Sequence, residues 1–418
     1  MKKIKALLCT LSAASLLLTG CGDDAVYTAH KEITEITLSW WGNDARHTYT
    51  IEAIERFEEL HPEIKVQCSY SEWSGYEARN RVRMASGTES DVNLINVGWL
   101  SQYSPDGKGY YDIEELSEYV DLSTFSESML DYGRVNGILN AIPIAMNAQT
   151  VYINKTVYEE HGLSVPQTWN DFFDAAKVLS KENIYALSAA PKSMWLYAIA
   201  YAEQMSGKSI LTDDGELNFT SDDLRVMIGF YEKLVDEKVI PQVEFYERLN
   251  VNTGEYAGTI AWVSDAVNYC GTAQKNGYEM VAANYTAENS FRSGEGWYAK
   301  PATLYAVSKN TEHPKEAAML LDFLLNSDEM AVLQGIEKGI PLSSKAKDTL
   351  AKNDKLEGLQ YEASLVMDNN KLIKHMDPIL ENTDIIDAYI EACDLVIYDK
   401  ATLDEAADQL SKKYKELF

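Results

Sequence analysis

The stretch ITEITLSWWGNDARH, residues 33–47, carries the clearest indication of the fold. Its apolar residues Ile36, Leu38 and Trp40 stand at every second position, and this period of two predicts a strand with one buried face. Trp40 therefore points into the core. Trp41 is left on the opposite face, next to a loop of polar side chains, which makes Trp41 the first candidate for a ligand contact.

The residues that follow alternate between helix and strand patterns. Apolar residues near every third position over 51–60 predict an amphipathic helix that Pro62 ends. A strand is expected over 64–68, a second helix over about 76–86 and a short strand over 91–97. The order strand, helix, strand, helix, strand predicts a mainly parallel sheet covered by helices. Ligands of such open sheets gather beyond the carboxyl ends of the strands.

A second unit of the same kind is expected further along the chain. Residues 142–147 contain proline among apolar residues and predict an extended crossing between the two units. The second unit then begins with a strand over 151–154. Its further expected elements are a helix capped by Thr168 and Asp171, strands over 258–265 and 301–307, and a helix opened by Pro314. The fold class is therefore α/β, with two such units.

Length, composition and charge narrow the class of protein. A chain of 418 residues exceeds one domain, and its 46% apolar and 24% charged residues are typical of a globular protein. The formal net charge is −28, which repels phosphate backbones and excludes nucleic acid as a partner.

The first residues read as a targeting segment. Residues 1–20 have a basic start and a short apolar run, as a signal peptide does. The sequence LTGC at 18–21 resembles the lipobox of bacterial lipoproteins, in which the cysteine receives the lipid. We therefore expect Cys21 to carry a lipid, residues 21–32 to form a tether, and the body to lie outside the cytoplasmic membrane. The processed chain keeps a net charge of about −31.

The sequence shows no pattern for a cofactor or a metal ion. It lacks paired CxxC motifs, HExxH, phosphate loops and dinucleotide-binding glycine motifs, so we expect no cofactor and no metal site. The remaining cysteines, Cys68, Cys270 and Cys393, are far apart in sequence, and we expect them to be buried free thiols.

Tryptophan supplies the candidate binding residues. Most of the chain's tryptophans adjoin glycine, serine or polar residues, which is typical of the rim of a binding site. Any one of them could equally be a core residue, but the set favours a site that stacks sugar rings and hydrogen-bonds their hydroxyls. The set is Trp41, Trp73, Trp99, Trp195, Trp262 and Trp297. With 65 acidic residues, some carboxylate pair will always have the spacing that a glycosidase needs, so the acids do not indicate catalysis.

Several stretches together resemble the extracellular solute-binding proteins of carbohydrate ABC importers, which are related to the maltose-binding type. They occur in the family's order between about residues 33 and 345. They read ITLSWWG at 36–42, FEELHPEIKV at 57–66, DV at 91–92 with WL at 99–100, IPI at 142–144 with YINK at 152–155, TWNDF at 168–172 and GIP at 339–341.

The resemblance implies two lobes that close on a ligand. The N-terminal lobe would take 33–144 and 300–345, and the C-terminal lobe 145–299 and 346–418. In the first lobe it implies ligand contacts by Trp41, Asp44 and Arg46, and in the second by Trp262 and Asp265. Further positions that it places near the cleft are Trp73, Trp99, Asn147, Trp195 and Trp297.

From these observations we expect a lipid-anchored, monomeric receptor, not an enzyme, that captures a sugar or oligosaccharide and delivers it to the permease subunits of an ABC importer. Two alternatives stay open at this point. One is a binding protein for a non-sugar solute such as a polyamine, which the negative charge would attract. The other is an anchored glycoside hydrolase.

Overall fold

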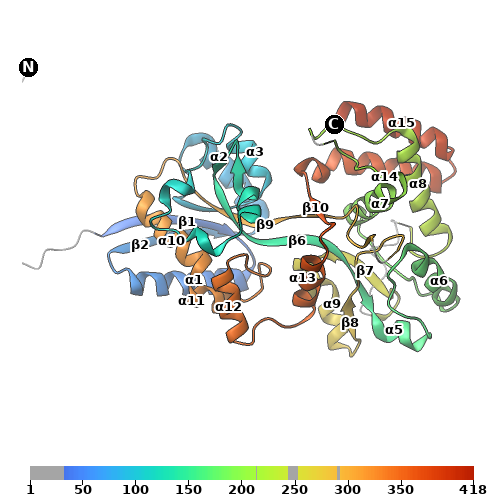
Figure 1. Cartoon of the computed structure of the whole chain (residues 1–418), viewed down its shortest axis with the longest axis horizontal. Helices are drawn as coiled ribbons and strands as arrows, with labels where there is room; N and C mark the ends of the chain where they lie inside the picture. The colour runs from blue at the N-terminus through green and yellow to red at the C-terminus, as the bar shows by residue number, and fades with distance from the viewer. Residues whose placement is uncertain (1–32, 213, 243–252, 290–291) are drawn as a thin grey trace, which may run out of the picture.

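The computed structural model describes residues 33–212, 214–242, 253–289 and 292–418 (Figure 1). The expected signal peptide at 1–20, the tether at 21–32 and the lipid site Cys21 lie outside the described residues. Figure 1 shows two lobes side by side, joined by extended strands. The two-lobe α/β architecture expected from the sequence is confirmed.

The first lobe begins as the sequence predicts. Strand β1 (Thr34–Trp41) buries Ile36, Leu38 and Trp40, and helix α1 (Asp44–Leu60) follows. The side chain of Asn43 caps α1 by accepting a hydrogen bond from the backbone N–H of Arg46, which satisfies a donor left free at the helix start. Strand β2 (Ile64–Ser71), helix α2 (Trp73–Ser86) and strand β3 (Val92–Ile95) complete the series.

The sheet is mixed, which corrects the expectation of a mainly parallel one. The strand order is β2-β1-β3-β9-β6-β7, with β8 paired to β6 and β10 to β9. β1 runs parallel to β2 and β3. β9 (Tyr298–Val307) returns antiparallel to both β3 and β6, and β7 (Gly258–Trp262) and β8 (Met280–Ala282) are antiparallel to β6. Strand direction depends on where a distant segment returns, so the local pattern could not give it.

Strand β6 (Ala141–Asn154) joins the lobes, and all of its 14 residues are buried. Ile142 and Ile144 belong to the core of the first lobe, whereas Met146 and Ala148 belong to the core of the second. The register between β6 and β9 shifts around Ala145, at the same point where the cores change. The crossing and the strand expected over 151–154 are therefore one continuous strand.

The second lobe is rich in helices. The helix expected at Thr168 is confirmed, with a capping box in which Thr168 and Asp171 bond each other's backbone N–H groups. Its helices are α5 (Lys155–Glu160), α6 (Trp169–Leu179), α7 (Pro191–Ser206), α8 (Ser221–Asp236), α9 (Ala266–Lys275), α13 (Leu359–Asn369), α14 (Thr383–Ile397) and α15 (Leu403–Leu417).

Three helices late in the chain cover the first lobe: α10 (Pro314–Asn326), α11 (Asp328–Gln334) and α12 (Ser344–Lys352). α10 buries the face predicted from its apolar spacing, including Leu320 and Leu321. α12 packs on α10 and α11, and α13 packs on β8 and α9. We therefore propose that the chain passes to the second lobe after α12 and not at residue 345.

The remaining elements are short. They are α3 (Gly98–Tyr103), α4 (Glu127–Leu130), β4 (Arg134–Val135), β5 (Ile138–Leu139), β10 (Lys374–His375) and the 3-10 turns η1 (Ile113–Leu116), η2 (Leu122–Thr124), η3 (Asp131–Gly133), η4 (Ser180–Glu182), η7 (Val263–Asp265) and η9 (Pro378–Glu381). Among the described residues, no helix has the length and apolar character that crossing a membrane requires.

The three cysteines of the body carry free thiols. Cys270 and Cys393 are buried as expected, but Cys68 is exposed. Cys68 lies on β2, the edge strand of the sheet, where one side of the strand has no neighbour to cover it.

Candidate functional site

A cavity of about 260 Å³ lies between the lobes. Both lobes and the crossing strand β9 contribute to its wall. The lining residues are Trp41, Arg46, Trp73, Asn96, Asn147, Ser264, Ala302, Thr303, Glu337 and Lys338. Trp41, the last residue of β1, and Arg46, in the first turn of α1, contribute to this wall, as expected for the carboxyl end of a strand in an open sheet.

Aromatic rings form the first-lobe side of the cavity. The rings of Trp41 and Trp73 meet edge to face with their centroids 4.9 Å apart. Trp99 stacks behind Trp73 at 5.8 Å and is 4% exposed, whereas Trp73 is 38% exposed. Trp41 and Trp73 thus present ring surface to the cavity, and the buried Trp99 fixes their orientation.

Gly42 allows Arg46 to lie against the end of β1. A Cβ at position 42 would come within 2.4 Å of Cδ of Arg46, so a larger residue there would displace the Arg46 side chain. The guanidinium of Arg46 donates a hydrogen bond from Nη1 to the backbone oxygen of Trp41 at 3.3 Å. The polar loop after β1 therefore places a cation next to the tryptophan.

Glu337 holds Arg46 in this position. Nη2 and Nε of Arg46 donate to the two carboxylate oxygens at 2.8 and 3.0 Å, and the hydroxyl of Tyr49 donates to Glu337 at 2.6 Å. Burial by itself would raise the pKa of Glu337, but the hydrogen bonds and the charge of Arg46 outweigh burial and lower the pKa. Glu337 is therefore a carboxylate whose charge Arg46 already neutralises.

Lys338 places a buried amino group on the wall of the cavity. The residue is 2% exposed, and Nζ donates a hydrogen bond to the hydroxyl of Tyr305 at 2.9 Å. Burial and, to a smaller extent, the nearby charge of Arg46 lower the pKa of Lys338, Glu337 acts to raise it, and the net result is a pKa of about 7.

The second lobe contributes hydrogen-bonding groups. Nδ2 of Asn147 donates to Oγ of Ser264 at 2.9 Å, and the backbone N–H of Ser264 donates to Oδ1 of Asn147 at 3.2 Å. This reciprocal pair joins the middle of β6 to the turn after β7. It fixes two polar side chains on the cavity wall.

A second group of charges lies beside the cavity, around Trp262. Nζ of Lys300 is 4.9 Å from the centre of the Trp262 ring, and Nζ of Lys192 is 5.8 Å from it. Both lysines form ion pairs with the single carboxylate of Glu381. Burial lowers the pKa of Lys300, while Glu381 acts to raise it.

The structure brings four of the expected site residues together on the cavity wall: Trp41, Arg46, Trp73 and Asn147. Others lie elsewhere. Asp44 is exposed in the first turn of α1, and Asp265 lies in η7, where it accepts a hydrogen bond from Asn268. Trp99 supports the wall from behind, and Trp262 lies next to the cavity beneath the two lysines.

Trp195 and Trp297 belong to the core of the second lobe, which corrects their expected place at the cleft. They are 0% and 3% exposed. Each indole N–H donates to a backbone oxygen at 3.1 Å, that of Leu380 for Trp195 and that of Thr286 for Trp297. Polar neighbours in sequence therefore do not mark a rim at these two positions.

Sequence reasoning missed several residues of the wall. Glu337 and Lys338 directly precede the GIP stretch that carries part of the family resemblance, and this position was the one available signal. Their role depends on the return of a distant segment to α1, which no local pattern gives. The other lining residues that were missed are Asn96, Ser264, Ala302 and Thr303.

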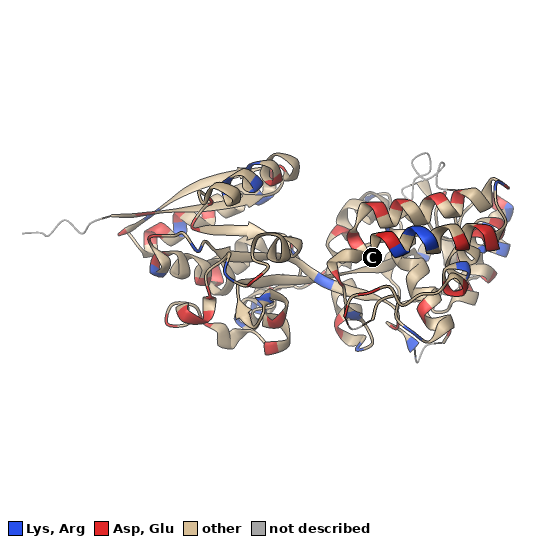
Figure 2. Ribbon diagram, turned by 90° about the horizontal axis from the view of Figure 1, so that it is seen from above, with Lys and Arg blue, Asp and Glu red and all other residues tan. Residues whose placement is uncertain are grey.

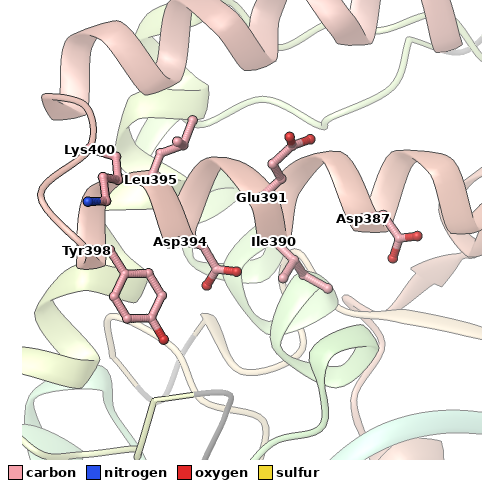
Figure 3. A pocket seen from close by; sticks show the side chains of 7 residues that line it. All are labelled: Asp387, Ile390, Glu391, Asp394, Leu395, Tyr398 and Lys400. Atoms are coloured by element: carbon pink, nitrogen blue, oxygen red, sulfur yellow. The ribbon is translucent and has the colours of Figure 1, made fainter.

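The structure shows another pocket, on the outer face of α14 (Figure 3). Its lining consists of residues of α14 and of the turn directly after it, including the acids Asp387, Glu391 and Asp394. The described residues contain no cluster of three or more His, Cys, Asp or Glu side chains suited to a metal ion. Residues of both lobes line the cavity between them, whereas the lining of the pocket on α14 comes from the second lobe.

Comparison with known proteins agrees with this geometry. The Yersinia enterocolitica periplasmic oligogalacturonide-binding protein, in complex with saturated digalacturonic acid, is 28% identical, with a TM-score of 0.79 over 92% of this chain and 98% of that chain. A de novo designed esterase has 27% identity and a TM-score of 0.84 over 92% and 98%. The multiple sugar-binding protein of Streptococcus mutans is 26% identical over 45% of this chain and 44% of its own length.

A family model matches a larger part of the chain than the Streptococcus mutans protein does. The model describes the bacterial extracellular solute-binding proteins and matches residues 52–358, which include β6, β9 and most of the cavity wall. The two lobes, the cavity between them and this match lead to one assignment: the chain belongs to the bacterial extracellular solute-binding protein family.

Proposed function

We propose that the protein captures a sugar or oligosaccharide between its two lobes. The observation that carries this proposal is the cavity wall itself, where the rings of Trp41 and Trp73 lie beside the polar side chains of Arg46, Asn96 and Asn147. Sugars offer apolar C–H faces that stack on aromatic rings and hydroxyls that bond amides and guanidinium groups. The wall offers partners for both.

The similar proteins support a saccharide ligand. One relative carries the name multiple sugar-binding protein, and one structural neighbour binds digalacturonic acid. A polyamine is disfavoured, because the cations Arg46 and Lys338 on the wall would repel it. The negative net charge of the chain therefore does not indicate a cationic ligand.

A catalytic role has less support. Glycosidases use two carboxylates on either side of the bond that they cleave. Among the described residues that line the cavity, Glu337 is the one carboxylate, and its lowered pKa is opposite to what a general acid needs. The designed esterase gives no reason to expect hydrolysis either, because the described lining includes no histidine or cysteine to activate Ser264.

Delivery and anchoring complete the proposal. The protein would work as a monomer outside the cytoplasmic membrane, held there by a lipid on Cys21, and would pass its ligand to the permease subunits of an ABC importer. Replacing Cys21 with alanine removes the lipid acceptor, so the variant should appear in the medium or keep its signal peptide. Fractionation that finds the processed variant still tightly bound to membranes contradicts the anchor.

A thermal-shift screen tests the binding proposal. Ligand that binds only the folded state stabilises it by about 2.7 kcal/mol at a hundredfold excess over Kd. We expect at least one neutral or acidic oligosaccharide to raise the melting temperature by several degrees, spermidine to leave it unchanged, and incubation with the sugar to produce no new reducing ends. A shift with spermidine and with no saccharide contradicts the proposal.

A further inference from the structure

The cavity is flanked by two groups of charges with an excess of cations. We define the first-lobe triad as Arg46, Glu337 and Lys338, and the second-lobe triad as Lys192, Glu381 and Lys300. Each contains two basic residues and one acid. The whole chain has a net charge of −28, so this excess of cations is opposite to the overall charge.

The second-lobe triad lies on the same face of the sheet as the cavity wall. Lys300 is directly opposite Asn147 in the β6–β9 register, and Asn147 lines the cavity. Residues opposite each other on neighbouring strands share a face. Trp262 is opposite Gln149, two positions along β6 from Asn147, and therefore shares this face too.

Lys300 is the only charged residue of β6 and β9, the two strands that cross between the lobes. Figure 2 shows a basic segment where the ribbons cross, in contrast to the acidic segments spread over the outer helices. The side chain of Lys300 is 16% exposed. A buried cation at the crossing is costly unless an anion accompanies it.

Lys338 has donors to spare. Arg46 and Tyr49 already occupy Glu337, and no carboxylate of the described residues lies within 4 Å of Nζ of Lys338. Its hydrogen bond to Tyr305 uses one of the three N–H donors of an ammonium group. The remaining donors belong to a buried amino group on the cavity wall. A carboxylate placed beside this group favours its charged form, so the position is suited to an anionic group of a ligand.

We propose that the ligand is an acidic saccharide, an oligomer containing uronic acid, whose carboxylates pair with Lys338 in the first lobe and Lys300 in the second. This inference rests on the proposed function and narrows it to one class of sugar. Trp41 and Trp73 stack on the rings while the two ammonium groups bind the carboxylates. A hydroxyl pairs less strongly with a buried ammonium than a carboxylate does.

The length of strand between the triads favours an oligomer. Lys300 lies two or three residues along β9 from Ala302 and Thr303, which line the cavity with Lys338. At about 3.3 Å per residue, this separation is roughly 7–10 Å of strand. Carboxylates on different rings of one oligosaccharide can reach both triads, and their binding to both lobes holds the lobes together.

Calorimetry with matched ligands tests the inference. The probes are oligomers of galacturonic and of glucuronic acid, each beside its carboxyl-reduced neutral counterpart, which differs only at C6. The acidic member of at least one pair should bind at least tenfold more tightly. Lys338→Met and Lys300→Met should each reduce affinity for that acidic ligand at least tenfold. Lys177→Met removes the same charge from the exposed surface of α6 and should change nothing.

The outcomes separate this inference from the proposed function. Neutral members that bind as tightly as the acidic ones overturn the acidic ligand. Met variants that keep the full preference for acid overturn the pairing of its carboxylates with Lys338 and Lys300. Either outcome leaves sugar binding intact. Failure of every saccharide to bind overturns both. Melting temperatures establish that each variant is folded. If Lys338→Met does not fold, the affinity of Lys300→Met for the acidic ligand tests the pairing by itself.

Discussion

Trp40 and Trp41 are neighbours in sequence but lie in different environments. Trp40 is 0% exposed in the core, whereas Trp41 lines the cavity. Trp41→Ala should therefore weaken saccharide binding by about 1–3 kcal/mol, or roughly ten- to hundredfold, with little change in stability. Trp40→Ala should instead destabilise the fold by about 3–5 kcal/mol. Melting temperature and calorimetric affinity, measured on both variants, check this contrast.

Trp262→Ala extends the test to the second lobe. The ring lies under Lys300 and Lys192, so its removal should lower saccharide affinity while the fold survives. Normal binding by both Trp41→Ala and Trp262→Ala contradicts an aromatic binding site between the lobes. A low melting temperature for Trp41→Ala, with Trp40→Ala losing only binding, means that the faces of β1 are reversed.

Lys338 makes stability depend on pH. Its pKa falls from 10.5 to about 7 on folding, so between these values the unfolded chain holds a proton that the folded chain lacks. The free energy of unfolding should therefore rise with pH in this window, with a contribution from this residue of up to about 1.4 kcal/mol per pH unit. The groups that face Lys338 are Arg46 and Tyr49 of α1, Tyr305 of β9, and Glu337, the residue directly before Lys338 in the sequence.

Denaturant unfolding between pH 7 and pH 9.5 measures this contribution. Lys338→Met should remove the rise, so the difference in stability between wild type and variant should change steadily across the window. Lys177→Met is the control and should run parallel to wild type. If the Lys338→Met curve also runs parallel to wild type, the ammonium is not buried as the structure shows it.

The sequence predicted the environment of some side chains correctly and of others not. The alternation in β1 correctly separated Trp40 from Trp41, because a period of two is a local property of the backbone. It could not separate Trp73 from Trp195, because only tertiary packing buries Trp195 and leaves Trp73 partly exposed. The sequence also could not identify the partner of Arg46, because Glu337 is 291 positions away along the chain.

At the scale of elements, the segment after α11 approaches the crossing strand closely. Gly339 has φ +107°, and a Cβ on it would lie 2.7 Å from Cβ of Ala145. Pro341 pairs with Ala145, and the backbone N–H of Leu342 donates to the oxygen of Ile144 at 2.9 Å. This contact holds Lys338 at the point where β6 passes between the lobes.

Gly339→Ala should lower stability by about 1–3 kcal/mol and also weaken ligand binding, because the segment that carries Lys338 must move. Gly277→Ala is a matched control, since φ there is +95° but a Cβ would meet no atom within 4 Å. Chemical denaturation and calorimetry of both variants separate backbone strain from the contact. Equal losses in the two variants contradict a role for the close approach.

Elements with strong local signals were predicted well. Thr168 and Asp171 form the expected capping box, and α10 begins at Pro314 and buries its apolar face. The sequence divided β6 into a link and a strand, because proline interrupts the pattern at residue 143. The structure keeps the strand continuous by shifting the register against β9 near that position.

At the scale of the whole molecule, each lobe has its own core and β6 passes between them. Two lobes with separate cores can move relative to each other about the strands that join them. A saccharide that contacts both walls of the cavity favours the closed arrangement, because only that arrangement allows both sets of contacts. Ligand capture and closure are then one event.

Small-angle scattering with and without saturating saccharide tests this claim most directly. The ligand is the oligosaccharide that gives the largest thermal shift, and a saccharide that gives none serves as the control. The radius of gyration should be smaller with the binding saccharide and unchanged with the control. An unchanged radius of gyration when calorimetry shows the site to be full would contradict a ligand held between two closing lobes.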